Sequence, residues 1–280
     1  MFKFLIDTAN IDYINGIIKN ILSDKISMSN VLGITTNPNA MAKINHHSLE
    51  SWLSVLPKLC ETVSDLRGDS LGRVHVQAPN SQMSGEEVLS FVKYISGHDD
   101  GSTKLALKIA PSISVLSKVR EIQEYMPVNV TGLSDCSSAL VCLSHGVDYV
   151  SIISGRMEEV GIDANSHLSF LMKRKRGTGE VITGSMRTVG GLLRAVSHDT
   201  IPTIGEKVWD QLADRDLTKE ANELNYFSQE DTANLSPLVS SENINLSLGF
   251  FDQMDKQGEQ AYNNYVNLWN KKLKRENCIS

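Results

Sequence analysis

The feature of this 280-residue chain that most restricts its fold is a repeated alternation of short apolar runs with segments of helical periodicity. Eight runs rich in β-branched residues span residues 2–9, 31–37, 74–78, 105–110, 127–132, 149–154, 180–185 and 200–204. Helical spacing appears in residues 10–22, 39–64, 83–95, 113–125, 134–146, 163–174, 188–197 and 205–213. Because such segments can connect parallel strands, the pattern predicts a closed parallel (β/α)8 TIM barrel, with a doubly wound open sheet as the alternative.

Polar residues in the predicted strands fall mainly on one side of each strand. In the run 105–110, Lys108 shares its side with Ala106 and Ala110, while leucine and isoleucine point the other way. The same alternation predicts a set of further inward-facing residues, namely Asp7, Thr35, Asn37, His75, Gln77, Asn129, Thr131, Ser151, Thr183 and Ser185. Active sites of such barrels lie at the C-terminal ends of the strands, so a polar interior there indicates an enzyme rather than a scaffold.

We expect three regions along the chain. Residues 1–216 form the catalytic barrel domain. Residues 217–249 are rich in Ser, Asn, Glu and Thr and lose the periodic pattern, which predicts a loose connection. Residues 250–280 regain a stripe of apolar residues at helical spacing and predict an extra amphipathic C-terminal helix, with Phe251, Met254, Tyr262, Tyr265, Trp269 and Leu273 on one face.

Composition and charge argue against several classes of protein. The formal net charge is −6, and the basic runs at 173–176 and 271–275 contain no interleaved aromatic residues, so we expect no nucleic-acid partner. The four cysteines show no CxxC spacing, and a chain of this length needs no disulfide framework, so we expect reduced thiols and a cytoplasmic location. Asp7 interrupts the first apolar stretch, and we expect neither a signal peptide nor a membrane span.

Lys108 is the most informative of the inward-facing residues. An ammonium group inside a barrel is unstable unless its pKa falls or a carboxylate balances its charge. With a lowered pKa, the free amine can attack a ketone, and Asp7 on the first strand is the natural partner for orientation and proton transfer. The alternative is a buried ion pair between Lys108 and Asp7 that only closes the barrel.

Two arginines follow late strands and indicate a phosphorylated ligand. Arg156 comes after the sixth predicted strand, and Arg187 comes after the seventh, two residues beyond Ser185. Phosphate sites in these barrels often lie in the late-strand loops, and paired guanidinium groups suit a phosphate dianion. The alternative for either arginine is a solvated surface charge. We predict no metal site, because His46, His47 and His145 have no companions at ligand spacing.

Six segments, in order, are similar to those of the transaldolase family, in the short-chain branch that includes fructose 6-phosphate aldolase. They are FLIDTANID, GITTNPNAMAK, LALKIAP, PVNVTG, YVSIISGRMEEVG and GSMRTV, and the similarity covers residues 2 to about 215. The resemblance implies that Lys108 forms a Schiff base and that Asp7 is a catalytic acid or base. It also implies that Gln77 and Thr131 hold a catalytic water, and that the substrate contacts are Thr35, Asn37, Asn129, Ser151, Arg156, Ser185 and Arg187.

The activity implied by the resemblance is that of a transaldolase of the pentose phosphate pathway, without a cofactor. Such an enzyme moves a dihydroxyacetone unit from a ketose phosphate, such as fructose 6-phosphate, to an aldose phosphate, such as erythrose 4-phosphate. Gln77 stands where transaldolases have a glutamate and aldolases a glutamine, Ile153 replaces an aromatic residue, and a proline expected soon after Ser151 is missing. Two alternatives therefore stay open: an aldolase that releases free dihydroxyacetone, and a degenerate barrel that only binds sugar phosphates.

The resemblance further implies a homo-oligomer in which the C-terminal stripe packs on a neighbouring barrel. Packing of the stripe on its own barrel is the alternative.

Overall fold

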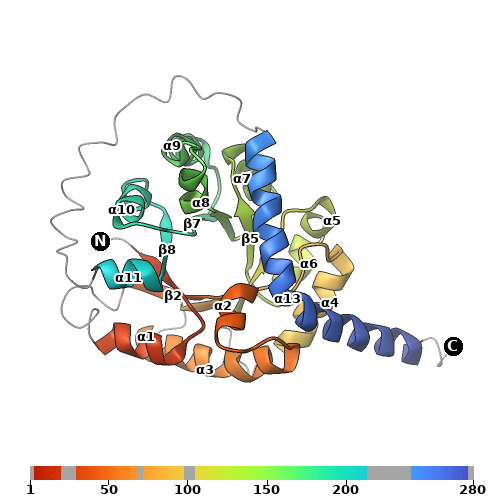
Figure 1. Ribbon diagram of the computed structural model, residues 1–280. Coiled ribbons are helices and arrows are strands. Elements are labelled where there is room, and N and C mark those ends of the chain that lie inside the picture. Colours follow the sequence, from red (N-terminus) through yellow and green to blue (C-terminus); the bar gives the residue numbers. More distant parts are fainter. Residues whose placement is uncertain (1–2, 20–29, 68–71, 98–104, 213–240, 277–280) are drawn as a thin grey trace.

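The computed structural model describes residues 3–19, 30–67, 72–97, 105–212 and 241–276. Its strands form a closed parallel barrel in chain order (Figure 1), and they are β1 Phe4–Asp7, β2 Val31–Thr35, β3 Arg73–Gln77, β4 Leu105–Ile109, β5 Val128–Leu133, β6 Tyr149–Ile152, β7 Glu180–Thr183 and β8 Ile201–Gly205. The last strand pairs with the first, with Thr203 opposite Leu5 and Gly205 opposite Asp7. The predicted (β/α)8 barrel is confirmed, and the open-sheet alternative is wrong.

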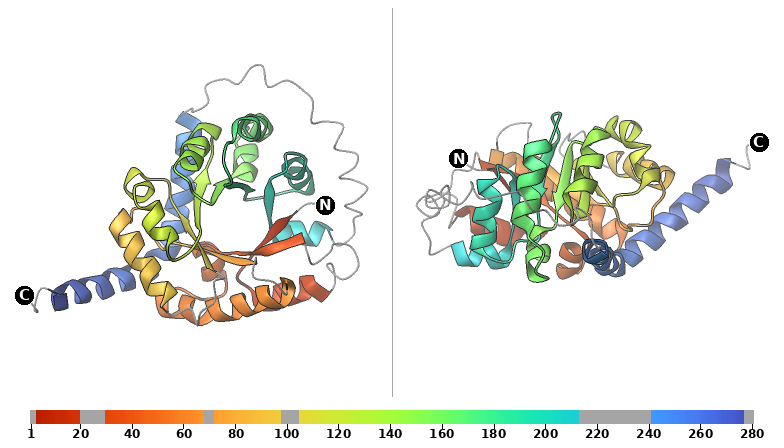
Figure 2. Two further views of the ribbon diagram at one scale, coloured as in Figure 1. Left: turned by 180° about the vertical axis from the view of Figure 1, so that it is seen from behind. Right: turned by 90° about the horizontal axis from the view of Figure 1, so that it is seen from above.

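Helices surround the barrel (Figure 2), and those described are α1 Ile11–Ile17, α2 Pro38–Lys43, α3 Leu49–Arg67, α4 Gly85–Ser96, α5 Ile113–Leu116, α6 Val119–Gln123, α7 Cys136–Ser144, α8 Ser154–Glu159, α9 Ala164–Arg174, α10 Val189–Ser197, α11 Glu206–Leu212 and α13 Ser241–Glu276. The helix predicted over 39–64 is divided into α2 and α3. The chain turns there because Asn45 adopts a left-handed φ of 62°, a conformation that commonly ends helices. The helix predicted over 113–125 is likewise divided, into α5 and α6.

The lumen contains an apolar cluster as well as buried polar residues. Leu5, Ile182 and Ile201 form a separate buried cluster inside the barrel. The predicted inward orientation of Thr183 is therefore wrong, because its strand neighbour Ile182 occupies the lumen and adjacent side chains point to opposite faces. The Thr183 hydroxyl instead lies 3.1 Å from that of Thr200, which donates to the α10 backbone.

The long helix α13 begins at Ser241, so residues 241–249, predicted to belong to a loose connection, are helical. Residues 217–240, the rest of that connection, lie outside the described residues. Figures 1 and 2 show α13 crossing one end of the barrel, in front of β5 and beside α2 in the view of Figure 1, with its C-terminal part extending away from the barrel.

The apolar stripe of α13 packs on its own barrel. Phe251 and Met254 are buried in a cluster with Phe250 and Ile153, and the ring of Tyr265 meets that of Phe91 edge-on, with a centroid distance of 5.6 Å. The prediction that the stripe packs on a neighbouring barrel is wrong for these buried residues. Tyr262 is partly buried against the same core. The side chains of Trp269 and Leu273 lie outside those that the structure describes.

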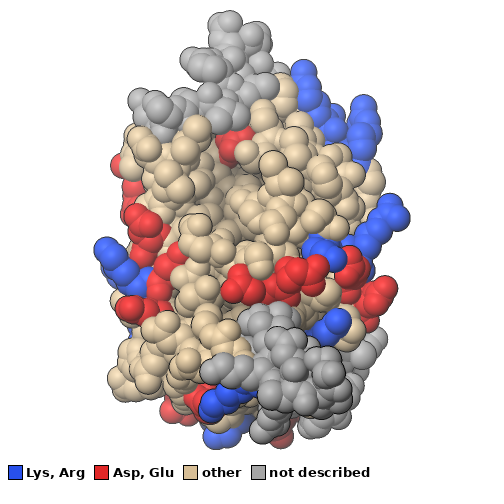
Figure 3. Space-filling model, turned by 90° about the vertical axis from the view of Figure 1, so that its right-hand side faces the viewer, with Lys and Arg blue, Asp and Glu red and all other residues tan. Residues whose placement is uncertain are grey.

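The described surface carries mixed charge. On the side shown in Figure 3, acidic side chains form a band and basic side chains lie around it.

None of the described helices combines the length and the hydropathy needed to cross a bilayer. Cys136 and Cys142 are buried free thiols, Cys60 is also buried, and Cys278 lies outside the described residues.

Candidate active site

Lys108 lies within the lumen on β4, and only 7% of the residue is exposed. Its Nζ donates hydrogen bonds to the Thr35 hydroxyl and to the Thr36 carbonyl oxygen, both at 3.0 Å. Burial lowers the pKa of Lys108 to about 8, against a smaller opposing attraction from Asp7. At pH 7 roughly a tenth of such a group is the neutral amine, which is the nucleophilic form.

Asp7 ends β1, beside Thr35 on one side and Gly205 on the other. Burial raises the pKa of its carboxyl, and the charges of Lys108, Lys43 and Arg187 oppose the rise. In the described part of the chain no direct ion pair joins Asp7 to Lys108, whose hydrogen bonds go to β2 and the residue after it. The pair is therefore arranged for charge interaction at longer range rather than as a direct bridge that closes the barrel.

Gln77 and Thr131 are buried on the strands that flank Lys108. Gln77 is directly opposite Lys108 in the β3–β4 register, and its Oε1 is buried with no hydrogen-bond partner among the described residues. A buried amide oxygen of this kind is normally satisfied by water or a ligand. The site thus provides an acceptor close to the lysine for a small polar group.

A chain of hydrogen bonds fixes Asn129 next to Lys108. The Ser151 hydroxyl donates to Asn129 Oδ1 at 2.8 Å, and Asn129 Nδ2 lies 3.1 Å from His75 Nδ1. Burial, followed by the charges of Lys108 and Arg73, lowers the pKa of His75 to about 3. His75 is therefore neutral at physiological pH and can accept the amide proton, so that both ends of the Asn129 side chain are oriented.

A cavity of about 480 Å³ lies beside this lumen. Five predicted site residues line it, namely Asp7, Asn37, Arg156, Ser185 and Arg187. Its charged lining comprises the basic residues Lys43, Arg156, Arg187 and Lys207 and the acidic residues Asp7, Glu159 and Glu206. The lining thus has four basic and three acidic side chains, and the cavity can hold a ligand with an anionic group.

Asn37 caps α2 at the rim of the cavity. Its Oδ1 accepts a hydrogen bond of 2.9 Å from the Ala40 backbone N–H, in the manner of a helix N-cap. The Nδ2 group of the same amide is left to donate to a hydroxyl in the cavity.

Arg156, on α8, is half-buried and is held by α13. Its Nη2 donates to Gln253 Oε1 at 2.5 Å, and its guanidinium carbon is 5.1 Å from the centre of the Phe250 ring. Its Nε is buried without a hydrogen-bond partner among the described residues. Burial, reinforced by the charge of Arg187, lowers the pKa of Arg156, although an arginine remains protonated at physiological pH.

Arg187 is more exposed and is paired with a carboxylate. Its Nε is 2.7 Å from Glu159 Oε1, and 42% of its side chain is accessible. Ser185 adopts a left-handed φ of 60°, which turns the chain between β7 and Arg187. Gly155 allows α8 to approach this turn, because a Cβ at that position would lie 1.7 Å from the Ser185 carbonyl oxygen.

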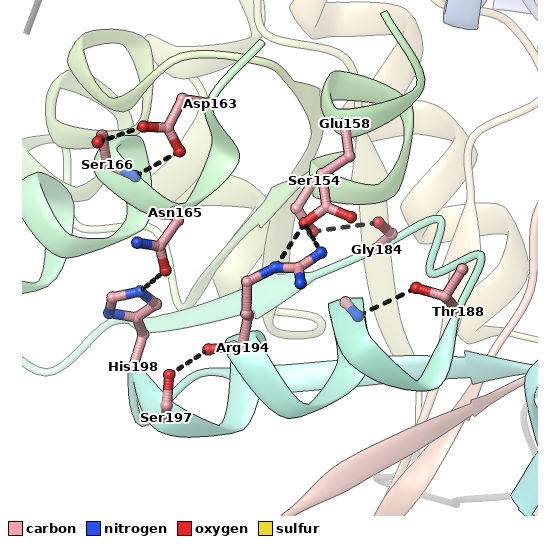
Figure 4. Close-up of polar contacts among 11 residues, drawn as sticks. Ser154, Glu158, Asp163, Asn165, Ser166, Gly184, Thr188, Arg194, Ser197 and His198 are labelled. Atoms are coloured by element: carbon pink, nitrogen blue, oxygen red, sulfur yellow. Dashed lines mark hydrogen bonds and ion pairs between the residues drawn. The ribbon is translucent and has the colours of Figure 1, made fainter. Parts of the chain in front are cut away.

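Polar contacts behind the cavity hold α8 and the β7–α10 turn together (Figure 4). Arg194 on α10 forms an ion pair of 2.8 Å with Glu158, the residue before Glu159. The Ser154 hydroxyl points to the Gly184 carbonyl oxygen, and His198, the residue directly after α10, contacts Asn165 on α9 at 2.7 Å. These contacts link the two segments that carry Arg156 and Arg187.

The structure thus divides the predicted site residues into two groups. Those lining the cavity are given above, and those buried in the lumen are Lys108, Thr35, Gln77, Asn129, Thr131 and Ser151. The cavity is also lined by Lys43, Lys207, Phe250 and Gln253, which were not predicted from the sequence. Lys43 could have been found from the sequence, because it lies on the helix that directly follows the predicted site residue Asn37. Among the described residues, no three His, Cys, Asp or Glu side chains are grouped to hold a metal ion.

Comparison with known proteins finds relatives that are named probable transaldolases. A probable transaldolase of Syntrophobacter fumaroxidans is 27% identical over 221 residues, which cover 77% of this chain and 91% of the relative. Probable transaldolases of Desulfotalea psychrophila (26% identical) and Bacillus anthracis (25%) each match over 79% of this chain and 94% of their own length. The sequence profile of the Transaldolase/Fructose-6-phosphate aldolase family matches residues 4–248. The chain therefore belongs to the transaldolase/fructose-6-phosphate aldolase family of enzymes.

Proposed function

We propose that this chain is a transaldolase that transfers a dihydroxyacetone unit from a ketose phosphate to an aldose phosphate through a Schiff base on Lys108. The observation that carries the proposal is a lysine with a lowered pKa in the lumen, beside a cavity lined by two arginines. One end of a ketose phosphate requires an amine nucleophile, and its other end requires cations. The lumen and the cavity offer these two environments side by side.

The first half of the reaction cleaves the donor sugar. The neutral amine of Lys108 attacks the ketone carbon, and the ketone oxygen leaves as water to give a protonated imine. The imine then accepts the electron pair of the C3–C4 bond as that bond breaks, and the C4 hydroxyl gives its proton to the Asp7 carboxylate. The phosphorylated fragment leaves as an aldose phosphate, and three carbons stay on Lys108 as an enamine.

The second half reverses these steps with a new aldehyde. The enamine carbon attacks the acceptor aldehyde, Asp7 returns its proton to the new hydroxyl, and water hydrolyses the imine. A carboxyl with a raised pKa suits transfer in both directions. We assign the entering and leaving water to Gln77 and Thr131, because Gln77 offers a buried acceptor without a protein partner among the described residues.

The remaining predicted residues are assigned to substrate binding. The amides of Asn37 and Asn129 face hydroxyl groups of the sugar, with Thr35 and Ser151 holding Lys108 and Asn129 in place. Arg156, Ser185 and Arg187 bind the phosphate. On this proposal the chain acts in the cytoplasmic pentose phosphate pathway, and assembly into a homo-oligomer stays a prediction.

Borohydride trapping tests the proposal. Incubation with fructose 6-phosphate and borohydride is expected to leave a reduced three-carbon adduct on Lys108, located by peptide mass spectrometry. An unmodified Lys108 would contradict an enzyme of this chemistry and would favour a barrel that only binds sugar phosphates.

A fructose 6-phosphate aldolase is the second candidate, because Gln77 is an amide where a carboxylate would assist proton transfer. The two activities differ in what happens to the enamine. An aldolase protonates it and releases free dihydroxyacetone, whereas a transaldolase passes it to an acceptor. Release of dihydroxyacetone at one rate with and without erythrose 4-phosphate would replace the transaldolase assignment by the aldolase.

A further inference from the structure

We propose that α13 completes the anion site of its own chain, with Gln253 as a positioning residue that holds the Arg156 guanidinium and Phe250 as the surface on which that group rests. The inference rests on the proposed function, because the anion is taken to be the phosphate of the sugar substrate. Both residues lie beyond residue 248, where the match to the family ends. They are therefore features that the family resemblance does not supply.

The contacts of Arg156 restrict its guanidinium on two sides. Gln253 accepts from Nη2 at 2.5 Å, and the Phe250 ring lies under the group within the range of a cation–π contact. Its Nε is buried without a described partner, although Arg156 lines the cavity. A buried donor of this kind is normally satisfied, and a phosphate oxygen in the cavity is a suitable acceptor.

The partner of Arg156 is a neutral amide, whereas the partner of Arg187 is a carboxylate. Arg187 is paired with the Glu159 carboxylate, which competes with any anion for its guanidinium. Gln253 instead holds Arg156 through an uncharged amide oxygen, and among the described residues no carboxylate forms a direct ion pair with Arg156, although Glu159 acts on its charge at longer range. Arg156 is therefore the arginine of the two that is better prepared to bind a dianion.

Contacts on both sides of residue 253 anchor α13. Towards its start, the Ser134 hydroxyl after β5 is 2.6 Å from the Asn243 carbonyl oxygen. Beyond residue 253, the Asp255 carboxylate accepts from the Ser81 backbone N–H at 2.9 Å and from its hydroxyl at 2.6 Å. Gly258 lies so close to the barrel that a Cβ would be 2.1 Å from the Pro79 carbonyl oxygen. The position of Gln253 is thus fixed by the docking of the whole helix.

Binding of inorganic phosphate to the full chain, measured by calorimetry at constant ionic strength, tests the inference. Gln253→Met keeps the length of the side chain but removes the acceptor, and it is expected to weaken phosphate binding about tenfold. Gln260→Met makes the same chemical change at an exposed position of α13 outside the cavity, and it is expected to leave binding unchanged.

Gly258→Ala tests independently whether the docking of α13 supports phosphate binding. Alanine favours a helix more than glycine does, so the substitution keeps α13 helical while the contact with Pro79 forces the helix outward. It changes no group in the cavity, yet it is expected to weaken phosphate binding as Gln253→Met does. Circular dichroism checks that both variants remain folded.

Either of two results would overturn the inference. One is no phosphate binding by the wild-type chain, and the other is unchanged phosphate binding in a folded Gln253→Met variant. A role of Gln253 in general packing would reduce turnover of fructose 6-phosphate and trapping of free dihydroxyacetone on Lys108 equally, whereas a positioning role raises KM for the phosphorylated sugar and leaves that trapping unchanged. Trapping of unphosphorylated dihydroxyacetone on Lys108 tests the chemistry separately. No adduct together with Gln253-dependent phosphate binding would reject the transaldolase and keep the anion site.

Discussion

The lumen around Lys108 and the cavity around Arg156 and Arg187 adjoin each other but are built differently. The lumen residues lie on strands, are almost fully buried, and are joined by short hydrogen bonds to neighbouring strands. The cavity residues lie at the last positions of β1 and β8, on short helices, on turns and on α13, and most of them are partly exposed. One part is buried and held by hydrogen bonds, and the other is charged and open to solvent.

This difference matches the demands of the two tasks. A nucleophilic amine requires desolvation, which only a buried position supplies, and a strand of a closed barrel holds it with little freedom. Recognition of a phosphate requires full charges, which are costly to bury completely. We therefore expect substitutions in the lumen to affect the chemical step and substitutions around the cavity to affect the choice of substrate.

The largest effect is expected for Lys108→Met. The thioether fills a similar volume without an amine, so the fold should persist while turnover falls to the uncatalysed background. Turnover of fructose 6-phosphate is the measurement, and Lys58→Met at an exposed position of α3 is the control. Substantial residual activity would show that Lys108 is not the nucleophile.

Arg156→Ala is expected to reduce kcat/KM for phosphorylated donors about tenfold to a hundredfold, because a charge-assisted contact contributes roughly 1.5 to 3 kcal/mol. Arg187→Ala is expected to have the smaller effect, since its side chain is more exposed and Glu159 already competes for it. Borohydride trapping of free dihydroxyacetone on Lys108, which needs no phosphate, should be equal in both variants and in the wild type. Equal losses for phosphorylated and free substrates would show that the arginines are structural.

The pH dependence of trapping reports on the lumen alone. With a Lys108 pKa of about 8, the neutral amine should increase about tenfold between pH 7 and pH 9 and then level off. A lysine with its ordinary pKa of 10.5 would give about a hundredfold rise over the same range, without a plateau. The sign follows from the chemistry, because deprotonation creates the nucleophile, so the rate rises as pH rises through 8. Rates of adduct formation with unphosphorylated dihydroxyacetone separate the two cases.

The smallest effect is expected for Gln77→Glu, a change of one group next to Lys108. A carboxylate can take a proton from the bound water, whereas an amide can only orient it, so transfer to erythrose 4-phosphate should rise severalfold. Gln77→Met, which removes the acceptor, should lower it. A rise in the release of free dihydroxyacetone instead would assign Gln77 to the choice between the two activities.

The sequence by itself determined the barrel and the lumen. Strand periodicity and the lengths of the connecting segments are local properties, and eight repeats of them have few compact solutions. The same alternation placed Lys108, Gln77 and Asn129 inside, because side chains of a strand point to alternate faces. Thr183 was misplaced because it was assigned to the same side of the strand as Ser185, which lies beyond the end of β7 in a left-handed turn.

Only the tertiary structure decided how the cavity is completed. The apolar stripe of α13 showed that one face of the helix is buried, but a stripe carries no information about the surface that covers it. That choice depends on shape at distant positions, such as the missing Cβ of Gly258 against Pro79. The lowered pKa of Lys108 and the support of Arg156 by Gln253 arise in the same way, because both depend on neighbours that are far apart in the chain and meet only after folding.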